Sequence, residues 1–370
     1  MKILYTNFHP RNGGGHVTYI MNLARGLRHA HEITVATPGS SRLYRYAGEL
    51  PGVRVADIRF RSRASALFGE AAALRRLIRH EGYDLIHVNG STDHRLAMIA
   101  TLGMRRPPIV FTKHNDLPLD TVGHRMRARF GTDRVIAVSE FVAGLLRRSP
   151  YGRLPIATIR HGIDTDFFAP PSAALRPGLR EKYFGATAPG KILLGSSGGT
   201  DYDKGWLDLL AGLAQLAPEN RQRFRVLVAG DPPDEAKMAR VRELGVQDQV
   251  VFPGLLDDVR PALAACDVGF VLSYREALSF ACREVMSLGL PALVSNAGGL
   301  PENVIDGRDG WVVPVRDPRA IAAVLQGMLD DPSRTAAMGA AAREKSLSDF
   351  GLAKFVEATF AVYQAALDGR

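Results

Sequence analysis

Residues 268–291 decide the fold: Val268-Gly-Phe-Val-Leu272-Ser-Tyr-Arg-Glu276-Ala-Leu-Ser279-Phe-Ala-Cys-Arg-Glu284-Val-Met-Ser-Leu-Gly289-Leu-Pro291. The apolar run over 268–272 predicts a strand. The apolar spacing from Phe280 to Leu288 predicts a short helix that ends at Gly289. A strand that leads into a helix is the building unit of parallel α/β sheets.

The polar residues of this stretch suggest its chemistry. Ser279 is a plausible cap for the helix, whose first backbone N–H groups attract phosphate. Glu276 lies in the turn after the strand, and Glu284 lies one to two turns into the helix. Carboxylates accept hydrogen bonds from vicinal hydroxyls, so two acids beside a phosphate-attracting helix end suit a sugar nucleotide. The alternative is an ordinary solvated helix face.

Strand and helix patterns alternate along the whole chain of 370 residues, of which 46% are hydrophobic. This alternation predicts doubly wound parallel sheets that bind ligands at the carboxyl ends of their strands, and the length favours two domains. Strand-like runs occur at Lys2–Thr6, Glu32–Thr37, Val53–Ile58, Leu85–Val88, Ile109–Thr112, Arg134–Val138, Lys191–Ser196, Phe224–Gly230 and Val250–Leu256.

Polar residues follow several strands of the first half. The segment His9-Pro-Arg-Asn-Gly13-Gly14-Gly15-His16 joins the first strand to an amphipathic helix. Its glycines let the backbone approach a phosphate or sugar, although it lacks the Gly-x-Gly-x-x-Gly dinucleotide pattern and could be a plain turn. Three further clusters follow later strands: Asn89-Gly90-Ser91, His114-Asn115-Asp116 and Ser139-Glu140.

Other features concern the cellular setting. No apolar run approaches the roughly 18 residues of a membrane-spanning helix. The start Met1-Lys-Ile-Leu-Tyr is expected to form a strand rather than a signal peptide. Cys266 and Cys282 lie in apolar surroundings without metal-ligand spacing, so buried free thiols in a reducing cytoplasm are expected.

The net charge of +9 is uneven along the sequence. Residues 1–170 contain 25 Lys and Arg against 13 Asp and Glu, and the remainder contains 22 against 25. The first half therefore carries all the excess positive charge, which favours an anionic partner such as a membrane surface, a phosphorylated glycolipid or nucleic acid.

Two basic segments mix cations with apolar side chains: Arg59, Arg61 and Arg63 before a helix that contains Leu67 and Arg79, and 124–130. Such segments bind anionic lipid head groups, although a solvated helix would look similar. Nucleic acid is disfavoured because no aromatic-rich strand or nucleic-acid module accompanies the charge. We therefore expect a protein that is cytoplasmic and peripheral at the inner face of the membrane.

Five ordered segments together resemble retaining glycosyltransferases of family 4, which have the GT-B fold. They are the glycine loop, Gly162-Ile-Asp164, Lys204-Gly205, Glu276 to Glu284 and Gly298-Gly-Leu-Pro-Glu302. The resemblance covers nearly the whole chain. It implies two Rossmann-like domains that face each other across a cleft: an acceptor-side domain over 1–170, a proline-rich linker over 171–189, and a nucleotide-sugar domain over 190–349. A last helix over 350–370 would cross back onto the first domain through Phe350, Phe355 and Phe360.

The resemblance also assigns roles. Glu276 would contact the donor sugar, Glu284 the ribose, and Lys204 the diphosphate. His114 would contact a sugar hydroxyl or the acceptor. The remaining donor-binding residues would be Gly14 and Gly15 near the diphosphate and sugar, Gly254 and Leu255 near the base, and Leu278, Ser279 and Phe280 at the helix start. Neither a metal nor a cofactor is expected. The Asp-x-Asp patterns at Asp164 and Asp201 resemble a GT-A metal motif, but Asp164 is already explained by its Gly-Ile-Asp context.

The chain departs from the family at two places. Gly199 stands where the family has an arginine that neutralises the leaving diphosphate, so another cation is needed there. Arg275 and Arg283 are nearby candidates in sequence. Ala277 and Ser279 replace the usual pair of glycines after the first glutamate.

The expected activity is transfer, with retention, from a nucleoside-diphosphate sugar to a glycolipid or polysaccharide acceptor. A UDP-sugar is the first expectation, with GDP- or ADP-sugars as alternatives. Lipopolysaccharide core or another envelope polysaccharide is the expected acceptor, on the basis of charge and family habit. Two other functions stay open: a GT-B sugar-nucleotide epimerase, and a non-catalytic sugar-nucleotide-binding protein, for which Gly199 is the supporting feature.

Overall fold

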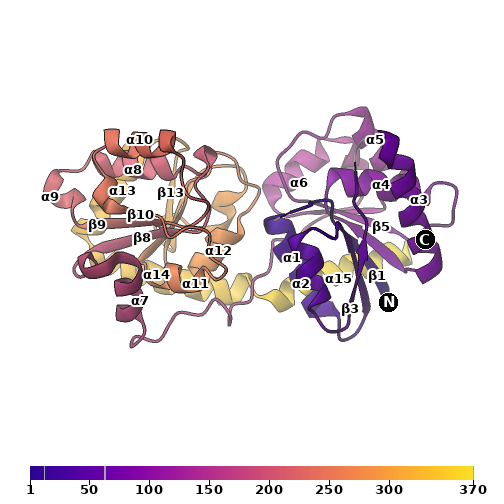
Figure 1. The fold of residues 1–370 in the computed structure, drawn as a ribbon, viewed down its shortest axis with the longest axis horizontal. Coiled ribbons are helices and arrows are strands. Elements are labelled where there is room, and N and C mark those ends of the chain that lie inside the picture. Colours follow the sequence, from indigo (N-terminus) through magenta and orange to yellow (C-terminus); the bar gives the residue numbers. More distant parts are fainter. Residues whose placement is uncertain (12, 62–63, 370) are drawn as a thin grey trace. The chain divides into compact units, whose positions relative to one another are not determined.

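The structure is a computed structural model that describes residues 1–11, 13–61 and 64–369. The chain divides into two compact units (Figure 1). Unit 1 comprises Met1–Gly162 and Leu352–Arg370, and unit 2 comprises Ile163–Gly351. Unit 1 therefore takes residues from both ends of the chain.

Unit 1 contains a seven-stranded, entirely parallel sheet in the order β3-β2-β1-β4-β5-β6-β7. The strands are nearly continuous apolar runs because helices cover both faces of such a sheet, and every residue of β4 and β5 is buried. The strands are β1 (Lys2–Thr6), β2 (Glu32–Thr37), β3 (Val53–Asp57), β4 (Leu85–Val88), β5 (Ile109–Lys113), β6 (Arg134–Ala137) and β7 (Ile156–Thr158).

Three α-helices of unit 1 begin where short polar side chains cap them. Ser41, Thr121 and Ser139 each accept a hydrogen bond from a backbone N–H three residues later, as N-caps do. The helices are α1 (Gly15–Leu27), α2 (Arg42–Gly48), α3 (Ala64–Glu81), α4 (Ser91–Thr101), α5 (Val122–Phe130), α6 (Glu140–Arg147), the 3₁₀ turn η1 (Pro150–Arg153) and α15 (Leu352–Asp368).

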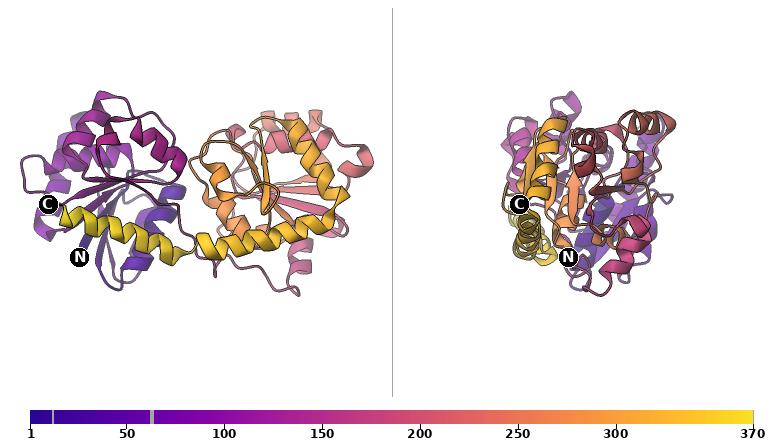
Figure 2. Two further views of the ribbon diagram at one scale, coloured as in Figure 1. Left: turned by 180° about the vertical axis from the view of Figure 1, so that it is seen from behind. Right: turned by 90° about the vertical axis from the view of Figure 1, so that its left-hand side faces the viewer.

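The last helix, α15, packs on α1 and β5 of unit 1. Figure 2 shows this helix in yellow, ending at the C-terminus. A chain of buried hydrogen bonds fixes it. The Tyr363 hydroxyl lies 2.5 Å from His87 Nδ1 and donates to the Tyr5 hydroxyl at 3.1 Å. His87 Nε2 lies 2.6 Å from Thr112 Oγ1. Burial lowers the pKa of His87 to about 3, so this network is neutral.

Unit 2 contains a six-stranded parallel sheet in the order β10-β9-β8-β11-β12-β13. The two sheets confirm the predicted doubly wound α/β architecture. The strands are β8 (Ile192–Ser196), β9 (Phe224–Val228), β10 (Val250–Val251), β11 (Val268–Val271), β12 (Ala292–Ser295) and β13 (Gly310–Val313).

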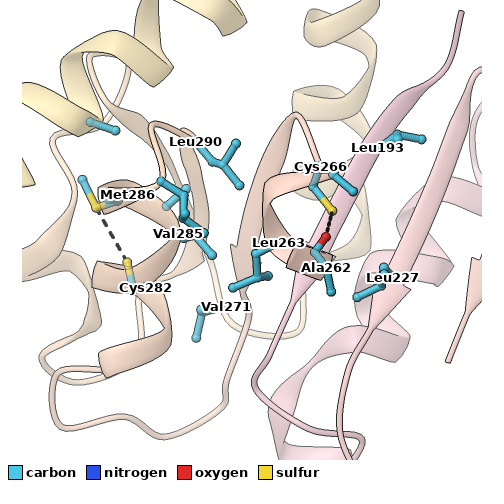
Figure 3. Packing of buried hydrophobic residues seen from close by; sticks show 14 of the residues in the cluster. Leu193, Leu227, Ala262, Leu263, Cys266, Val271, Cys282, Val285, Met286 and Leu290 are labelled. Carbon is cyan, nitrogen blue, oxygen red and sulfur yellow. Dashed lines mark hydrogen bonds between the residues drawn. The ribbon is translucent and has the colours of Figure 1, made fainter. Parts of the chain in front are cut away.

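Two hydrophobic clusters form the core of unit 2. One of them, shown in Figure 3, contains both cysteines, which are buried free thiols as expected. Burial raises the pKa of Cys282 to about 12, so this thiol is unreactive. The helical elements are α7 (Arg176–Phe184), η2 (Gly185–Thr187), η3 (Tyr202–Lys204), α8 (Trp206–Ala214), α9 (Pro218–Arg221), α10 (Glu235–Glu243), η4 (Gln247–Gln249), α11 (Arg260–Ala264), α12 (Phe280–Ser287), η5 (Leu300–Asn303), α13 (Pro318–Asp330) and α14 (Pro332–Asp349).

The structure differs from the sequence-based expectation in two segments. Residues 171–189, expected as a linker, contain α7 and η2, and Phe184 packs into the core of unit 2. Pro177 lies in the first turn of α7, where a missing N–H costs little. Phe350, expected to contact the first domain, is buried in the core of unit 2 instead, because α15 begins only at Leu352.

Candidate active site

In unit 1, the glycine loop leads from β1 into α1. Gly13 and Gly14 have φ values of 65° and 48°, a conformation that glycine adopts readily, and Gly14 occupies the N-cap position of α1 without a side-chain cap. Gly14 and Gly15 are exposed, and a Cβ at Gly14 would meet nothing within 4 Å. The loop therefore presents open backbone at a helix N-terminus. Asn12 lies outside the described residues.

Aromatic rings surround His114 at the carboxyl end of β5. The His114 ring centroid lies 4.3 Å from that of His16, 4.5 Å from Tyr19 and 6.0 Å from His161. Burial, followed by the neighbouring histidines, lowers the pKa of His114 well below its usual value. Burial also lowers the pKa of His16 to about 3. His114 is therefore a neutral imidazole at physiological pH.

Asn89 at the end of β4 sets the tautomer of His114. The Asn89 amide nitrogen donates to the Thr6 carbonyl at 3.1 Å, so its oxygen faces His114 Nε2, 3.0 Å away. Nε2 must then carry the proton, which makes Nδ1 the basic nitrogen of the ring. An imidazole held in this way can accept a hydrogen bond from a hydroxyl group.

The loop after His114 is held by Lys113. The buried Lys113 ammonium donates to Asn115 Oδ1 at 2.7 Å and to the Leu117 carbonyl at 2.9 Å. Burial lowers the pKa of Lys113 to about 8. These two bonds anchor the turn that follows His114.

A cavity of about 930 Å³ lies at the carboxyl ends of β1, β2 and β3. Arg59 and Arg61 of the predicted basic segment line it together with Asp57. The Asp57 carboxylate also accepts a hydrogen bond from the Gly39 N–H at 2.8 Å. Arg63 lies outside the described residues. The cavity therefore has a positive balance beside the edge that carries the glycine loop.

In unit 2, the two predicted glutamates lie on the segment between β11 and α12. The Gly299 N–H donates to the Glu276 carbonyl at 3.0 Å, and Asn303 Nδ2 donates to the Leu278 carbonyl at 2.6 Å. These bonds hold the Gly298-Gly-Leu-Pro-Glu302 turn against the Glu276 segment. The Glu276 to Glu284 motif and the Gly298-Gly-Leu-Pro-Glu302 motif are therefore in direct contact.

Ser279 caps α12 in a strained conformation. Its hydroxyl accepts a hydrogen bond from the Cys282 N–H at 3.2 Å, as predicted for a cap. Its φ is +94°, which an L-residue other than glycine rarely adopts. Such backbone strain is concentrated at functional sites.

Glu284 lies in the second turn of α12, and burial raises its pKa to about 7. Its carboxyl group thus changes charge close to physiological pH. Glu276 is partly exposed, and its Oε1 accepts a weak hydrogen bond from the Ala277 N–H at 3.3 Å.

Lys204 is brought to the same edge of the sheet by its neighbours. The Tyr274 N–H donates to the Asp203 carbonyl at 2.7 Å. Gly205 has a φ of +69°, and a Cβ there would lie 2.0 Å from the Leu272 carbonyl oxygen. Only glycine permits this close approach, which holds the Lys204 turn against the end of β11.

Glycines also meet at the ends of β8, β9 and β10. Gly199 has a φ of +90°, and a Cβ at Gly230 would lie 2.6 Å from the Gly199 Cα. The Gly230 N–H donates to the Gly254 carbonyl at 3.0 Å, and the next residue, Leu255, is 69% exposed. Gly254 and Leu255 therefore share the edge with Lys204. Gly199 has a backbone conformation that disfavours any side chain, arginine included.

Three arginines near this edge in sequence or in space have different environments. Arg283 is buried, donates from Nε to Asn303 Oδ1 at 2.8 Å and lies 4.2 Å from the Phe350 ring centroid, so it supports the core of unit 2 rather than this edge. Arg275 is exposed and remains a candidate. Sequence reasoning missed Arg316, which follows β13 and lies 4.2 Å from the Tyr274 ring centroid. Its place after a strand could have suggested it.

The first Asp-x-Asp pattern has a structural role. Asp164 Oδ1 accepts hydrogen bonds from the backbone N–H groups of Asp166 and Phe167 at 3.1 and 2.9 Å, which forms a local turn. Within residues 1–11, 13–61 and 64–369, no three His, Cys, Asp or Glu side chains group as a metal site requires.

The predicted site residues thus form two groups, each at the carboxyl edge of one sheet. Gly14, Gly15 and His114 belong to unit 1. Unit 2 holds Lys204, Gly254, Leu255, Glu276, Leu278, Ser279, Phe280 and Glu284. Both groups combine backbone at the start of a helix with side chains that can hydrogen-bond to hydroxyl groups.

Two family profiles, both of glycosyltransferases, match most of the chain. The profile described as Glycosyltransferase Family 4 matches residues 13–167, and that of Glycosyl transferases group 1 matches residues 180–345. A relative from Mycolicibacterium smegmatis, the GDP-mannose-dependent alpha-(1-6)-phosphatidylinositol monomannoside mannosyltransferase, is 29% identical, with 94% of each chain covered.

Two solved structures share the fold over almost their full lengths. Anabaena HepE in complex with UDP has a TM-score of 0.81 and 21% identity, covering 99% of this chain and 100% of that chain. WaaG, a glycosyltransferase involved in lipopolysaccharide biosynthesis, has a TM-score of 0.74 and 17% identity, covering 98% and 99%. The fold is GT-B. The chain belongs to the family of glycosyltransferases that these two profiles describe.

Proposed function

We propose that the protein transfers a sugar from a nucleoside-diphosphate sugar to a membrane-associated, phosphate-bearing glycolipid or glycan, with retention at the anomeric carbon. The observation that carries this proposal is the start of α12, where Ser279 caps a helix between Glu276 and Glu284, beside Lys204. A donor fits this edge because it pairs an anionic diphosphate with a ribose and a sugar, each rich in hydroxyls.

Each residue of the unit 2 edge has a role in the proposal. The free N–H groups at the start of α12 and the Lys204 ammonium would bind the diphosphate, and would stabilise the charge that develops on it as the glycosidic bond breaks. Glu284 would accept hydrogen bonds from the ribose hydroxyls, and Glu276 from the donor sugar. Gly254 and Leu255 would border the base.

The unit 1 edge would receive the reacting sugar and the acceptor. Gly14 and Gly15 offer backbone N–H groups, and neutral His114 offers Nδ1 to a hydroxyl. We propose that the acceptor attacks from the face that the diphosphate leaves, with the leaving phosphate taking the acceptor proton. No carboxylate nucleophile and no metal is then required.

The surface of unit 1 favours an anionic membrane acceptor. On α5, Val122, Met126 and Phe130 are four residues apart and exposed by 71%, 45% and 43%. Residues four apart lie on one helix face, so they form an exposed apolar stripe. Arg125 and Arg129 flank it and, with Arg153, line a cavity of about 490 Å³. Such a surface suits insertion among anionic lipids.

Part of the other basic segment is structural. Arg75 on α3 donates to the carbonyls of Ala100 and Leu102 at 2.9 and 2.7 Å, so it braces α4. Phe68 on the same helix is 77% exposed. No helix in the described part of the chain is both long and apolar enough to cross a membrane. We therefore propose peripheral attachment at the inner face of the membrane, chiefly through α5.

The named relatives support this substrate class. The Mycolicibacterium smegmatis enzyme is named for a GDP-mannose donor and a phosphatidylinositol mannoside acceptor, and WaaG for lipopolysaccharide biosynthesis. HepE binds UDP. A lipopolysaccharide core or a related envelope glycan remains our proposed acceptor, with UDP-, GDP- and ADP-sugars as candidate donors.

One observation favours a second function, a non-catalytic sugar-nucleotide-binding protein. Gly199 offers no cation to the leaving group, and its φ of +90° disfavours any side chain there. Lys204 would then hold a diphosphate without promoting its departure.

The test measures binding and turnover of UDP-, GDP- and ADP-sugars, with and without vesicles that contain a phosphate-bearing glycolipid. We expect one saturable donor, consumed faster with the glycolipid. Glu276→Ala should lose at least about 100-fold in turnover while keeping its melting temperature, and Glu243→Ala on the exposed face of α10 is the control. Tight donor binding without turnover under every condition would establish the non-catalytic alternative.

A further inference from the structure

A second cavity lies in unit 2, at the opposite edge of the sheet from the donor-binding groups. Lys191 and Ile192 at the start of β8, Asp267 just before β11 and Pro291 just before β12 all line it. Because the strands are parallel, these residues mark the amino edge. Its volume is about 650 Å³, which is in the usual range for small-molecule sites. We name it the amino-edge cavity.

The charge of this cavity is strongly positive. Four cations line it, Arg176, Arg180, Lys191 and Arg343, against one carboxylate, Asp267. That carboxylate is already shared: it accepts hydrogen bonds from Arg176 at 2.8 Å, from Arg180 at 2.9 Å and from the Leu193 N–H at 2.9 Å. The lining thus carries three positive charges more than negative ones, and a ligand with a single carboxylate would balance only one of them.

The rest of the wall is apolar. Leu288, Leu290 and Met328 line the cavity and are buried against the core, with Pro291 beside them. A site that joins guanidinium groups to an apolar wall suits an anion that carries a carbon skeleton. Guanidinium groups match the oxygens of phosphate in pairs, and a phosphate monoester carries nearly two negative charges at neutral pH.

Arg343 connects the cavity with the first residues of unit 2. From α14 its Nη1 donates to the Thr165 carbonyl at 2.9 Å and to the Ser287 carbonyl at 2.8 Å. Pro170 and Pro171 of the same early segment also line the cavity. An occupant would therefore contact the stretch through which the chain enters unit 2.

We propose that the amino-edge cavity is a second binding site, for a small phosphate monoester such as a sugar phosphate or a nucleoside monophosphate. The site is separate from the donor edge and does not rest on the proposed transferase activity. Its cations hold the phosphate, and its apolar wall packs against the body of the ligand.

Lys191→Met tests this proposal on the full-length protein. Calorimetry would measure binding of inorganic phosphate, glucose 6-phosphate and AMP, with uncharged glucose as a reference. We expect saturable binding of at least one ester, weakened by roughly 10- to 100-fold in Lys191→Met because a charge-assisted hydrogen bond is lost. Lys182→Met is the matched control: this lysine is exposed on α7 and does not line the cavity.

Lys204→Met distinguishes the two edges of unit 2. Binding in the amino-edge cavity should be unchanged by this variant, because Lys204 lies at the carboxyl edge. Ester binding that is lost in Lys204→Met but kept in Lys191→Met would mean that the phosphate occupies the donor edge, and would overturn the proposal. Equal binding by wild type and Lys191→Met, or no saturable binding at millimolar concentration, would overturn it as well.

Discussion

Ser279 combines two opposing effects on stability in a single residue. Its hydroxyl caps α12, while its φ of +94° strains the backbone. Ser279→Gly should stabilise the fold, since relief of about 1–2 kcal/mol of strain exceeds the few tenths lost with the cap. Ser279→Ala keeps the strain, loses the cap and should cost about 1 kcal/mol. Urea unfolding measures both, and an alanine variant more stable than the glycine variant would contradict this account.

Glu284 should make stability and donor affinity depend on pH in opposite directions. Its pKa is about 7 in the folded protein, against a usual 4.5. Between these values the folded protein binds more protons than the unfolded chain, so the free energy of unfolding falls as pH rises from 4.5 to 7. In the proposed function the Glu284 carboxylate accepts hydrogen bonds from the ribose, so donor binding should strengthen as pH rises through 7.

Glu284→Gln isolates this effect. The variant should be more stable than wild type above pH 7, by up to about 3 kcal/mol, and should differ little near pH 4.5. It should also bind donor more weakly at pH 8. Chemical unfolding at pH 5 and pH 8 measures the difference, with Glu243→Gln on exposed α10 as the control. A stability difference that is the same at both pH values would disprove the assignment.

At the scale of elements, the backbone conformation of the loop after β8 disfavours an arginine at position 199. Gly199→Arg introduces the arginine that the family resemblance implies at this position, but places it at a φ of +90°. We expect a loss of about 1–2 kcal/mol in stability and no gain in turnover. Gly178→Arg is the matched control, because this exposed glycine lies within α7, where arginine should stabilise the helix by roughly 0.5–1 kcal/mol. Faster turnover in Gly199→Arg would show that the loop adapts.

Most of the elements could be predicted from sequence because their signals are local. The apolar runs of β1, β2 and β4 and the cap of α12 are readable without tertiary information. Because both the α12 segment and Lys204 follow strands of one parallel sheet, the sequence also predicts that they lie at the same carboxyl edge. Short strands such as β7 (Ile156–Thr158) carry too few residues to reveal a period.

The remaining features depend on contacts that are distant in sequence. In the sequence Arg283 resembles a surface cation. In the structure it donates a hydrogen bond to Asn303, which is twenty residues away. The ring cluster around His114 joins residues from α1, β5 and the segment after β7. The prolines over 170–189 predict a linker. Only the structure shows that one of them, Pro177, lies in the first turn of a helix.

At the scale of the whole molecule, α15 makes unit 1 dependent on the C-terminus. Tyr363→Phe removes the hydroxyl that meets His87 Nδ1 and the Tyr5 hydroxyl, so each of these two buried atoms loses that hydrogen bond. We expect a loss of about 1–3 kcal/mol confined to unit 1. Calorimetry should show a lower melting temperature for one transition only. Gln364→Ala, on the exposed face of α15, should leave both transitions in place.

The split composition of unit 1 also has a consequence for biosynthesis. Residues 1–162 leave the ribosome first, yet Tyr5 and His87 find their partner only when Tyr363 emerges. The 189 residues from 163 to 351 must be translated in between, which takes about 10 to 40 s at typical rates. During that interval the nascent first unit exposes the face that α15 later covers, and exposed apolar surface of this kind favours aggregation.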